Sequence, residues 1–161
     1  MSDLENQLVI DVKDGGKIHI DLMPDLAPKH VERVKELTRS GFYDGRPFHR
    51  VIEGFMAQTG CPRGDGTGGS DLPNLEAEFS DYPFDRGVLG MARAQHPNSA
   101  NSQFFIMFDE GHFLNGQYTV FGKVTAGMEH VDAIKKGSRA ANGSIDGAPD
   151  TMIKVSVAAD A

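Results

Sequence analysis

The sequence predicts a mainly β fold, an eight-stranded antiparallel closed β-barrel capped by two short α-helices. About eight short apolar segments follow one another at hairpin spacing, several of them alternating between hydrophobic and polar residues, with glycine-containing turns between them. The 19 glycines and 8 prolines fit a chain with many turns and argue against long helices. Closing the sheet removes the exposed edges that short antiparallel strands would otherwise present.

Size and composition indicate one domain, which we expect to span residues 1–161. The net charge of −7 argues against nucleic acid as a main partner, because binding to phosphates needs a basic face. The single cysteine, Cys61, excludes an internal disulfide and is expected to be a small buried residue. No signal peptide and no apolar stretch of membrane-spanning length is visible. We therefore expect a cytoplasmic protein that does not bind membranes.

Residues 7–22 predict a β-hairpin. Asp14-Gly15-Gly16 is a strong turn signal, and the residues on either side of it alternate in polarity. One face of the hairpin is apolar throughout and should pack on a core; it consists of Leu8, Ile10, Val12, Ile18, Ile20 and Leu22.

A helix is predicted next, beginning at Pro28, which suits a first helical turn, and ending at Gly41. Its inner face carries apolar residues at helical spacing, namely Val31, Val34 and Leu37.

The central part of the chain predicts further strands and one long loop. Residues 48–58 form two extended runs joined at Glu53-Gly54. Residues 60–74 are rich in glycine and predict an irregular surface loop, and loops of that length are usually functional. Three more strands are predicted at residues 87–92, 104–108 and 118–124.

The C-terminal part predicts a second short helix and the last strand. Thr125 can cap the helix, Gly137 can end it, and Met128, Val131 and Ile134 would face inward. Residues 138–150 are expected to be a loop, and the last strand has the alternating residues Ile153, Val155 and Val157.

The stretch Phe48–Gln58 predicts a shallow pocket with one strong hydrogen-bond donor and no nucleophile. It places the guanidinium of Arg50 close to Phe55 and Met56, with Gln58 following, and alternation along an extended chain can bring such groups to one surface. The opposite wall is expected from residues 91–94, 101–105 and 113–118.

Other chemistries lack their usual motifs. The six histidines are dispersed and there is no second cysteine, so no metal site is expected. The sequence lacks the Gly-x-Ser-x-Gly motif that would indicate a hydrolase. The glycine-rich loop lacks the Gly-Lys-Ser/Thr ending of a phosphate-binding loop. We therefore expect no cofactor.

Three motifs resemble those of the cyclophilin family. They are Phe48-His49-Arg50-Val51-Ile52-Glu53-Gly54-Phe55-Met56-Ala57-Gln58, Asn101-Ser102-Gln103-Phe104-Phe105-Ile106 and Val120-Phe121-Gly122-Lys123-Val124. They occur in the expected order, and the match runs over about residues 6–158 with features of bacterial members. The resemblance implies a peptidyl-prolyl cis-trans isomerase, or rotamase, that assists protein folding without a cofactor on a cyclophilin-like barrel.

The resemblance also implies roles for individual residues. Arg50 would be catalytic; the remaining site residues would bind substrate, and they are Phe55, Met56, Gln58, Ala92, Arg93, Ala94, Gln103, Phe105, Phe113, Leu114 and Tyr118. Arg93, Phe113 and Tyr118 stand where asparagine, tryptophan and histidine are usual in eukaryotic members. Since the tryptophan is associated with tight cyclosporin binding, weakened affinity for cyclosporin is expected.

The expected partners are proline-containing peptides and unfolded or folding proteins, bound by a monomer. Two alternatives use the same scaffold. One is a non-catalytic proline-binding or chaperone module, which the presence of Arg50 and of the apolar residues disfavours. The other is a barrel that holds a small hydrophobic ligand, which the bulky aliphatic strand faces disfavour because they should fill the interior.

Overall fold

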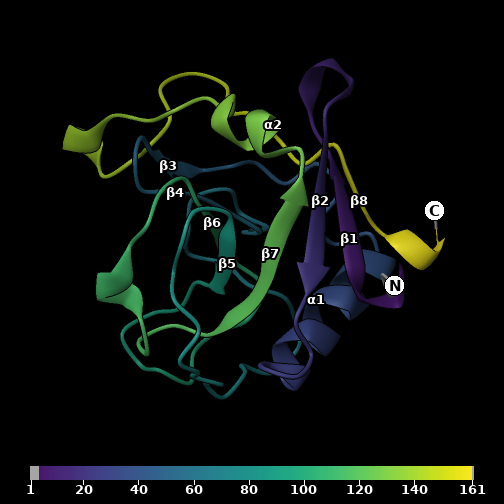
Figure 1. Cartoon of the computed structure of the whole chain (residues 1–161). Helices are drawn as coiled ribbons and strands as arrows, with labels where there is room; N and C mark the ends of the chain where they lie inside the picture. The colour runs from purple at the N-terminus through teal and green to yellow at the C-terminus, as the bar shows by residue number, and fades with distance from the viewer. Residues whose placement is uncertain (1–3, 161) are drawn as a thin grey trace.

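Eight antiparallel strands form one curled sheet in the computed structural model, which describes residues 4–160 (Figure 1). The order across the sheet is β3-β4-β6-β5-β7-β2-β1-β8. The strands are β1 (Gln7–Asp11), β2 (Lys17–Leu22), β3 (Arg50–Ile52), β4 (Met56–Thr59), β5 (Val88–Met91), β6 (Phe104–Met107), β7 (Val120–Ala126) and β8 (Lys154–Val157). The predicted fold class is confirmed.

The barrel is closed by the segments that precede its two end strands, β3 and β8. Pro47 forms an isolated antiparallel bridge with Thr151. On either side of the bridge, the amide of Phe48 donates to the carbonyl of Asp150 at 2.8 Å, and the amide of Met152 donates to the carbonyl of Arg46 at 2.9 Å. The curled sheet therefore closes through a few main-chain bonds outside the strands.

Large apolar side chains fill the barrel. All six residues of the predicted hairpin face are buried, as expected from their alternation. Tyr43 and Phe121 each pack edge-on against Phe104, with ring centroids 5.4 and 5.8 Å apart. The filled interior disfavours an enclosed ligand cavity. It also gives the residues on the outer face of the barrel a rigid support.

The two helices lie at opposite ends of the barrel (Figure 1). Helix α1 spans Pro28–Arg39 and buries Val31, Val34 and Leu37, as predicted. Helix α2 spans only Met128–Asp132, so its predicted end at Gly137 is wrong. Although shorter than expected, α2 is followed by the buried Ile134, which still packs into the core.

The start of α2 also differs from the prediction. Thr125 lies within β7, and the N-cap is Gly127, whose φ of 84° is in the left-handed region. A Cβ atom at this position would overlap the carbonyl oxygen of Lys17 on β2. The close approach of the chain to β2 therefore requires glycine, and it displaces the helix start from the threonine.

The last strand is shorter than predicted. Strand β8 begins at Lys154, and the side chain of Ile153 is 55% exposed although the alternation placed it inward. The amide of Ile153 donates to the carbonyl of Asp11 at 2.8 Å, so this residue continues the pairing with β1 while its side chain points outward.

Within residues 4–160, five short 3-10 turns complete the fold: η1 (Leu4–Asn6), η2 (Lys13–Gly15), η3 (His112–Leu114), η4 (Arg139–Ala141) and η5 (Ala158–Asp160). Turns η3 and η4 lie in the β6–β7 and α2–β8 connections, which border the site described below. None of the helices within residues 4–160 has the length and apolar character needed to cross a membrane.

Candidate active site

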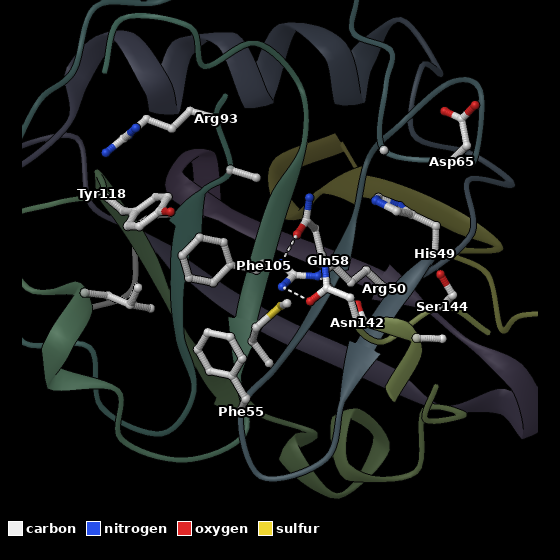
Figure 2. Close-up of a pocket in the computed structure, with 15 residues that line it drawn as sticks. His49, Arg50, Phe55, Gln58, Asp65, Arg93, Phe105, Tyr118, Asn142 and Ser144 are labelled. Carbon is white, nitrogen blue, oxygen red and sulfur yellow. Dashed lines mark hydrogen bonds between the residues drawn. The ribbon is translucent and has the colours of Figure 1, made fainter. Parts of the chain in front are cut away.

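A pocket of about 430 Å³ opens on the outer face of the sheet, over β3, β4 and β6 (Figure 2). Consecutive residues of a strand point to opposite faces. Accordingly, Phe104 and Ile106 belong to the barrel core, whereas Phe105 and Met107 belong to a second apolar cluster. The pocket is lined by His49, Arg50, Phe55, Met56, Gln58, Asp65, Gly66, Ala92, Arg93, Phe105, Leu114, Tyr118, Ala141, Asn142 and Ser144.

One side of the pocket is an apolar cup formed by Phe55, Met56, Phe105 and Leu114. The ring of Phe105 meets Tyr118 edge-on at 5.7 Å, and buried Phe84 stacks behind it at 5.7 Å. These four residues were predicted to meet from separate parts of the chain, and the structure brings them together.

Gly90 on β5 makes room for the ring at the base of this cup. A Cβ atom at Gly90 would lie 2.6 Å from Cζ of Phe105 and 2.7 Å from Cε1 of Phe84. Such distances are shorter than van der Waals contact, so a side chain at this position would displace the stacked rings.

Arg50 is held on the other side of the pocket by two amide side chains (Figure 2). It stands opposite Gln58 in the β3–β4 register. Its Nη1 donates to Oε1 of Gln58 at 3.2 Å and its Nη2 donates to Oδ1 of Asn142 at 2.9 Å. Its Nε donates to the backbone carbonyl of Asn142 at 3.1 Å. The guanidinium is thereby fixed in one orientation.

The charge of this group survives its partial burial. Burial lowers the pKa of Arg50 from its ordinary value. Arginine nevertheless stays protonated in proteins. The pocket therefore combines an apolar cup with a fixed positive hydrogen-bond donor.

Asn142 was not predicted as a site residue, because it is 92 positions from Arg50 in sequence. It adopts a left-handed φ of 55°, and the following Gly143 has a φ of 84°. The loop is attached to β3 on both sides of Val51, whose amide donates to Gly143 at 2.9 Å and whose carbonyl accepts from Gly137 at 2.8 Å. The Asn142-Gly143 pair, a frequent turn sequence, was the available signal.

A chain of side-chain amides extends from Arg50 to the glycine-rich loop. Gln58 donates from Nε2 to Oε1 of Gln103 at 2.9 Å. Gln103 donates in turn to the carbonyls of Gly66 and Gly68, at 3.0 and 2.8 Å. Gln103 and Ala94 lie in an adjoining hollow of about 360 Å³ rather than in the main pocket, and Ala92 and Arg93 border both.

Arg93 lies flat on the rim. Its guanidinium is 4.7 Å from the centroid of the Tyr118 ring and donates through Nη2 to the carbonyl of Gln117 at 2.8 Å. Its Nη1 donates to the carbonyls of Ala94 and Gln95. Arg93 therefore fixes the edge of the pocket, and it donates its hydrogen bonds to backbone carbonyls of the protein.

Phe113 lies outside the main pocket. Its side chain is 72% exposed and rests against Phe55, with ring centroids 5.6 Å apart. The predicted substrate-binding set is therefore split between the main pocket, the hollow beside Ala94 and the outer side of Phe55.

His49 is a second lining residue that the sequence did not single out. Both ring nitrogens are inaccessible to solvent and have no hydrogen-bond partner within residues 4–160. Burial lowers the pKa of this imidazole, so the ring is neutral around pH 7. It borders the pocket beside Asp65 and Gly66 of the glycine-rich loop.

Comparison with known proteins identifies relatives over nearly the whole chain. The family model described as cyclophilin type peptidyl-prolyl cis-trans isomerase matches residues 7–157. A probable peptidyl-prolyl cis-trans isomerase of Brucella suis is 57% identical over 170 residues, covering 99% of this chain and 86% of that protein. Peptidyl-prolyl cis-trans isomerase B of Bacillus subtilis is 44% identical over 127 residues, covering 78% of this chain and 88% of that protein.

Solved structures agree with these matches. A cyclophilin from Hirschia baltica superposes with a TM-score of 0.86 at 26% identity, covering 99% of this chain and 76% of that one. A cyclophilin type peptidyl-prolyl cis-trans isomerase of Cryptosporidium parvum, crystallised in the presence of the dipeptide Ala-Pro, superposes with a TM-score of 0.83 at 29% identity. That match covers 94% of this chain and 98% of the other.

Proposed function

Because this chain belongs to the cyclophilin-type peptidyl-prolyl cis-trans isomerases and catalyses rotation about X–Pro peptide bonds, we propose that Arg50 is its catalytic residue. The observation that carries this proposal is the fixed guanidinium beside the apolar cup. Asn142 and Gln58 hold the guanidinium, and Phe55 and Phe105 form part of the cup next to it.

The reaction asks for binding and electrostatics rather than covalent chemistry. Amide resonance gives the X–Pro bond a rotational barrier of about 18–20 kcal/mol. Uncatalysed exchange takes on the order of tens to hundreds of seconds. No covalent bond is broken, so the reaction needs neither a nucleophile nor a cofactor. An enzyme must grip one side of the bond and stabilise the twisted state.

Arg50 supplies that stabilisation. As the amide twists, its nitrogen loses conjugation with the carbonyl and gains a lone pair that can accept a hydrogen bond. Three N–H groups of Arg50 donate to Asn142 and Gln58. The guanidinium carries further N–H groups that can reach the substrate. An interaction that is stronger in the twisted state than in the planar one lowers the barrier.

The apolar cup formed by Phe55, Met56, Phe105 and Leu114 takes the proline ring. The flanking peptide lies along Gln58 and Gln103 and along the rim formed by Ala92, Arg93 and Ala94. Tyr118 and Phe113 add aromatic surface beside the cup and influence which ligands bind more than the chemical step.

The isomerase binds proline-containing peptides. We further propose that its natural substrates are unfolded or folding proteins, that it acts in the cytoplasm as a monomer with one domain, and that it assists folding. Cyclosporin is expected to bind weakly, because the position associated with tight binding carries Phe113. The exposure of that ring, 72%, supports a looser contact than a buried aromatic would give.

A proline-peptide isomerisation assay tests the role of Arg50. The Arg50→Ala variant should lose about 100- to 1000-fold in kcat/KM, the cost of removing one preorganised transition-state donor. Arg39→Ala is the matched control, since this exposed arginine pairs with Glu5 and Asp160 on another part of the surface. Near-normal activity in Arg50→Ala, with circular dichroism unchanged, would refute the proposal.

A further inference from the structure

A groove of about 400 Å³ continues the active site on the side away from Ala92 and Arg93. We call it the outer groove; it is lined by Ile52, Gly54, Glu110 and Phe113 together with three residues of the main pocket, Arg50, Phe55 and Asn142. The hollow beside Ala94 adjoins the main pocket on its opposite side. The three depressions therefore form one continuous path with the proline cup in the middle.

The floor of the outer groove is apolar. Phe113 is the most exposed of the large hydrophobic side chains described, and its ring leans on Phe55 with an interplanar angle of 38°. Phe55 lines both the outer groove and the main pocket, where it forms part of the proline cup. A side chain that follows or precedes the proline can therefore pack on Phe113 while the proline stays in the cup.

The outer end of the groove carries negative charge. The side chain of Glu110 is 69% exposed, and among ion pairs of the described residues its partner is His112 at 3.9 Å. That imidazole lies closer to Asp85, at 2.7 Å, so Asp85 takes its hydrogen bond. Asp109 is a further exposed carboxylate beside Glu110. Arg50 is the cation among the residues that line the groove, and three of its N–H groups donate to Asn142 and Gln58.

We propose that the outer groove is a substrate subsite for a lysine or arginine on one flank of the proline, with the aliphatic stem on Phe113 and the charged end at Glu110. Long basic side chains cover apolar surface with their stems while the charge stays in water, which fits an exposed ring next to an exposed carboxylate. The inference rests on the proposed function, because it assumes that the proline ring occupies the cup.

Two sets of proline peptides test this subsite. Each set carries lysine or glutamate at the first, second or third position, before the proline in one set and after it in the other. The wild-type protein should favour lysine over glutamate by about three- to tenfold in kcat/KM and in affinity, on one flank only. Glu110→Gln should reduce that ratio by about threefold, and Glu110→Lys should invert it.

Glu129→Gln is the matched control. Glu129 is an exposed carboxylate, 76% accessible, with a histidine partner at 3.7 Å, and it lies on α2 outside the groove. Its removal changes the net charge equally and should leave the ratio at the wild-type value. Equal preference on both flanks, or equal effects of the two glutamine variants, would mean that long-range attraction explains the preference and would overturn the proposal.

The affinity measurement separates this inference from the role of Arg50. Dissociation constants for the lysine and glutamate peptides can be measured with Arg50→Ala as well as with the wild-type protein. If Arg50→Ala stays active, the catalytic proposal fails while the affinity ratio still tests the subsite. If affinities for the two peptides are equal in wild type, the subsite proposal fails whatever the activity of Arg50→Ala.

Discussion

At Arg50, orientation depends on groups that come from three separate parts of the chain. Gln58 lies across the β3–β4 ladder, and Asn142 reaches in from the loop before β8. The side chain of Gln58 is itself held by Gln103 on the approach to β6. A mobile arginine would lose conformational entropy on binding the twisted bond. The side chain of Arg50 is already held in one orientation, so this loss is smaller.

Asn142→Gly should lower kcat/KM by about tenfold, because it removes one hydrogen bond to a charged group. Glycine accepts the left-handed φ of 55° without strain, and the backbone carbonyl that binds Nε of Arg50 remains. The loss should fall mainly on the turnover number, measured by kinetics over a range of peptide concentrations. A variant with normal turnover would show that Gln58 and the backbone suffice to hold the guanidinium.

The sequence predicted the positions of some site residues better than those of others. Phe55, Met56 and Phe105 belong to motifs with alternating strand pattern, and the structure brings them together in the pocket lining. Asn142-Gly143 is a local signal for a turn, but it does not reveal that this turn meets Arg50, and the burial of His49 depends on the folded loop around it. Phe113 was predicted to bind substrate, but the turn η3 directs its ring outward against Phe55 and outside the main pocket.

At the scale of elements, the packing of β5 against β6 sets the depth of the cup. Gly90 faces Phe105 across the ladder between these strands. The outward-pointing ring of Phe105 lies over this glycine, with the buried ring of Phe84 next to it. The strand pair therefore decides how far Phe105 projects into the pocket.

Gly90→Ala should push the ring of Phe105 toward the cup and raise KM several-fold. Overpacking of this kind also costs about 1–3 kcal/mol of folding free energy. Peptide titration and chemical denaturation measure the two effects on the same sample. Unchanged affinity together with unchanged stability would mean that the rings of Phe105 and Phe84 have space to move away from position 90.

The element boundaries that sequence missed are those set by tertiary contact. Helix α2 starts late because Gly127 must approach Lys17, which the helical spacing of Met128, Val131 and Ile134 does not reveal. Ile153 continues the alternation of the last strand in sequence, but its side chain is outside the barrel. Hairpin 7–22 was predicted well because its turn and its pairing are both local.

Across the whole molecule, one buried contact ties α1 to the long loop before β5. Glu78 accepts hydrogen bonds from the amide of His30 at 2.9 Å and from its Nδ1 at 2.6 Å. The other ring nitrogen, Nε2, is buried without a partner. Protonation would turn Nε2 into an unsatisfied buried donor, and burial accordingly lowers the pKa of His30.

Stability should therefore decrease as the pH falls below about 6.5, the ordinary pKa of histidine. In that range the unfolded chain binds more protons than the folded one, so the free energy of unfolding rises with pH. Burial of His49 acts in the same direction. His112, whose pKa Asp85 raises, acts oppositely, but its exposure to solvent weakens the effect.

Denaturant unfolding at several pH values between about 5 and 8 measures this dependence. His30→Gln should flatten the profile, whereas the control His96→Gln, at an exposed position, should keep the wild-type slope. Identical slopes in all three proteins would exclude His30 as the origin. Catalysis should respond less to pH than stability does, because Arg50 stays protonated throughout this range.

The barrel as a whole was predictable because its hairpins and alternating faces are local features of the chain. Its closure was not predictable in the same way. The segments joined by the Pro47–Thr151 bridge carry no alternating pattern, and the bridge depends on the complete sheet being in place. The position of Arg50 also depends on the complete sheet, because the segment that closes the barrel leads directly into β3.

If Arg50 is the catalytic residue, it binds the twisted X–Pro bond more strongly than the planar one. Nuclear magnetic resonance exchange measurements on a saturated complex give the cis-trans rate of the bound peptide, and titration gives its dissociation constant. In Arg50→Ala the bound-state rate should fall about 100-fold while the dissociation constant changes by less than about threefold. A dissociation constant that increases about 100-fold with an unchanged bound-state rate would mean that Arg50 serves substrate binding and not the twisted state.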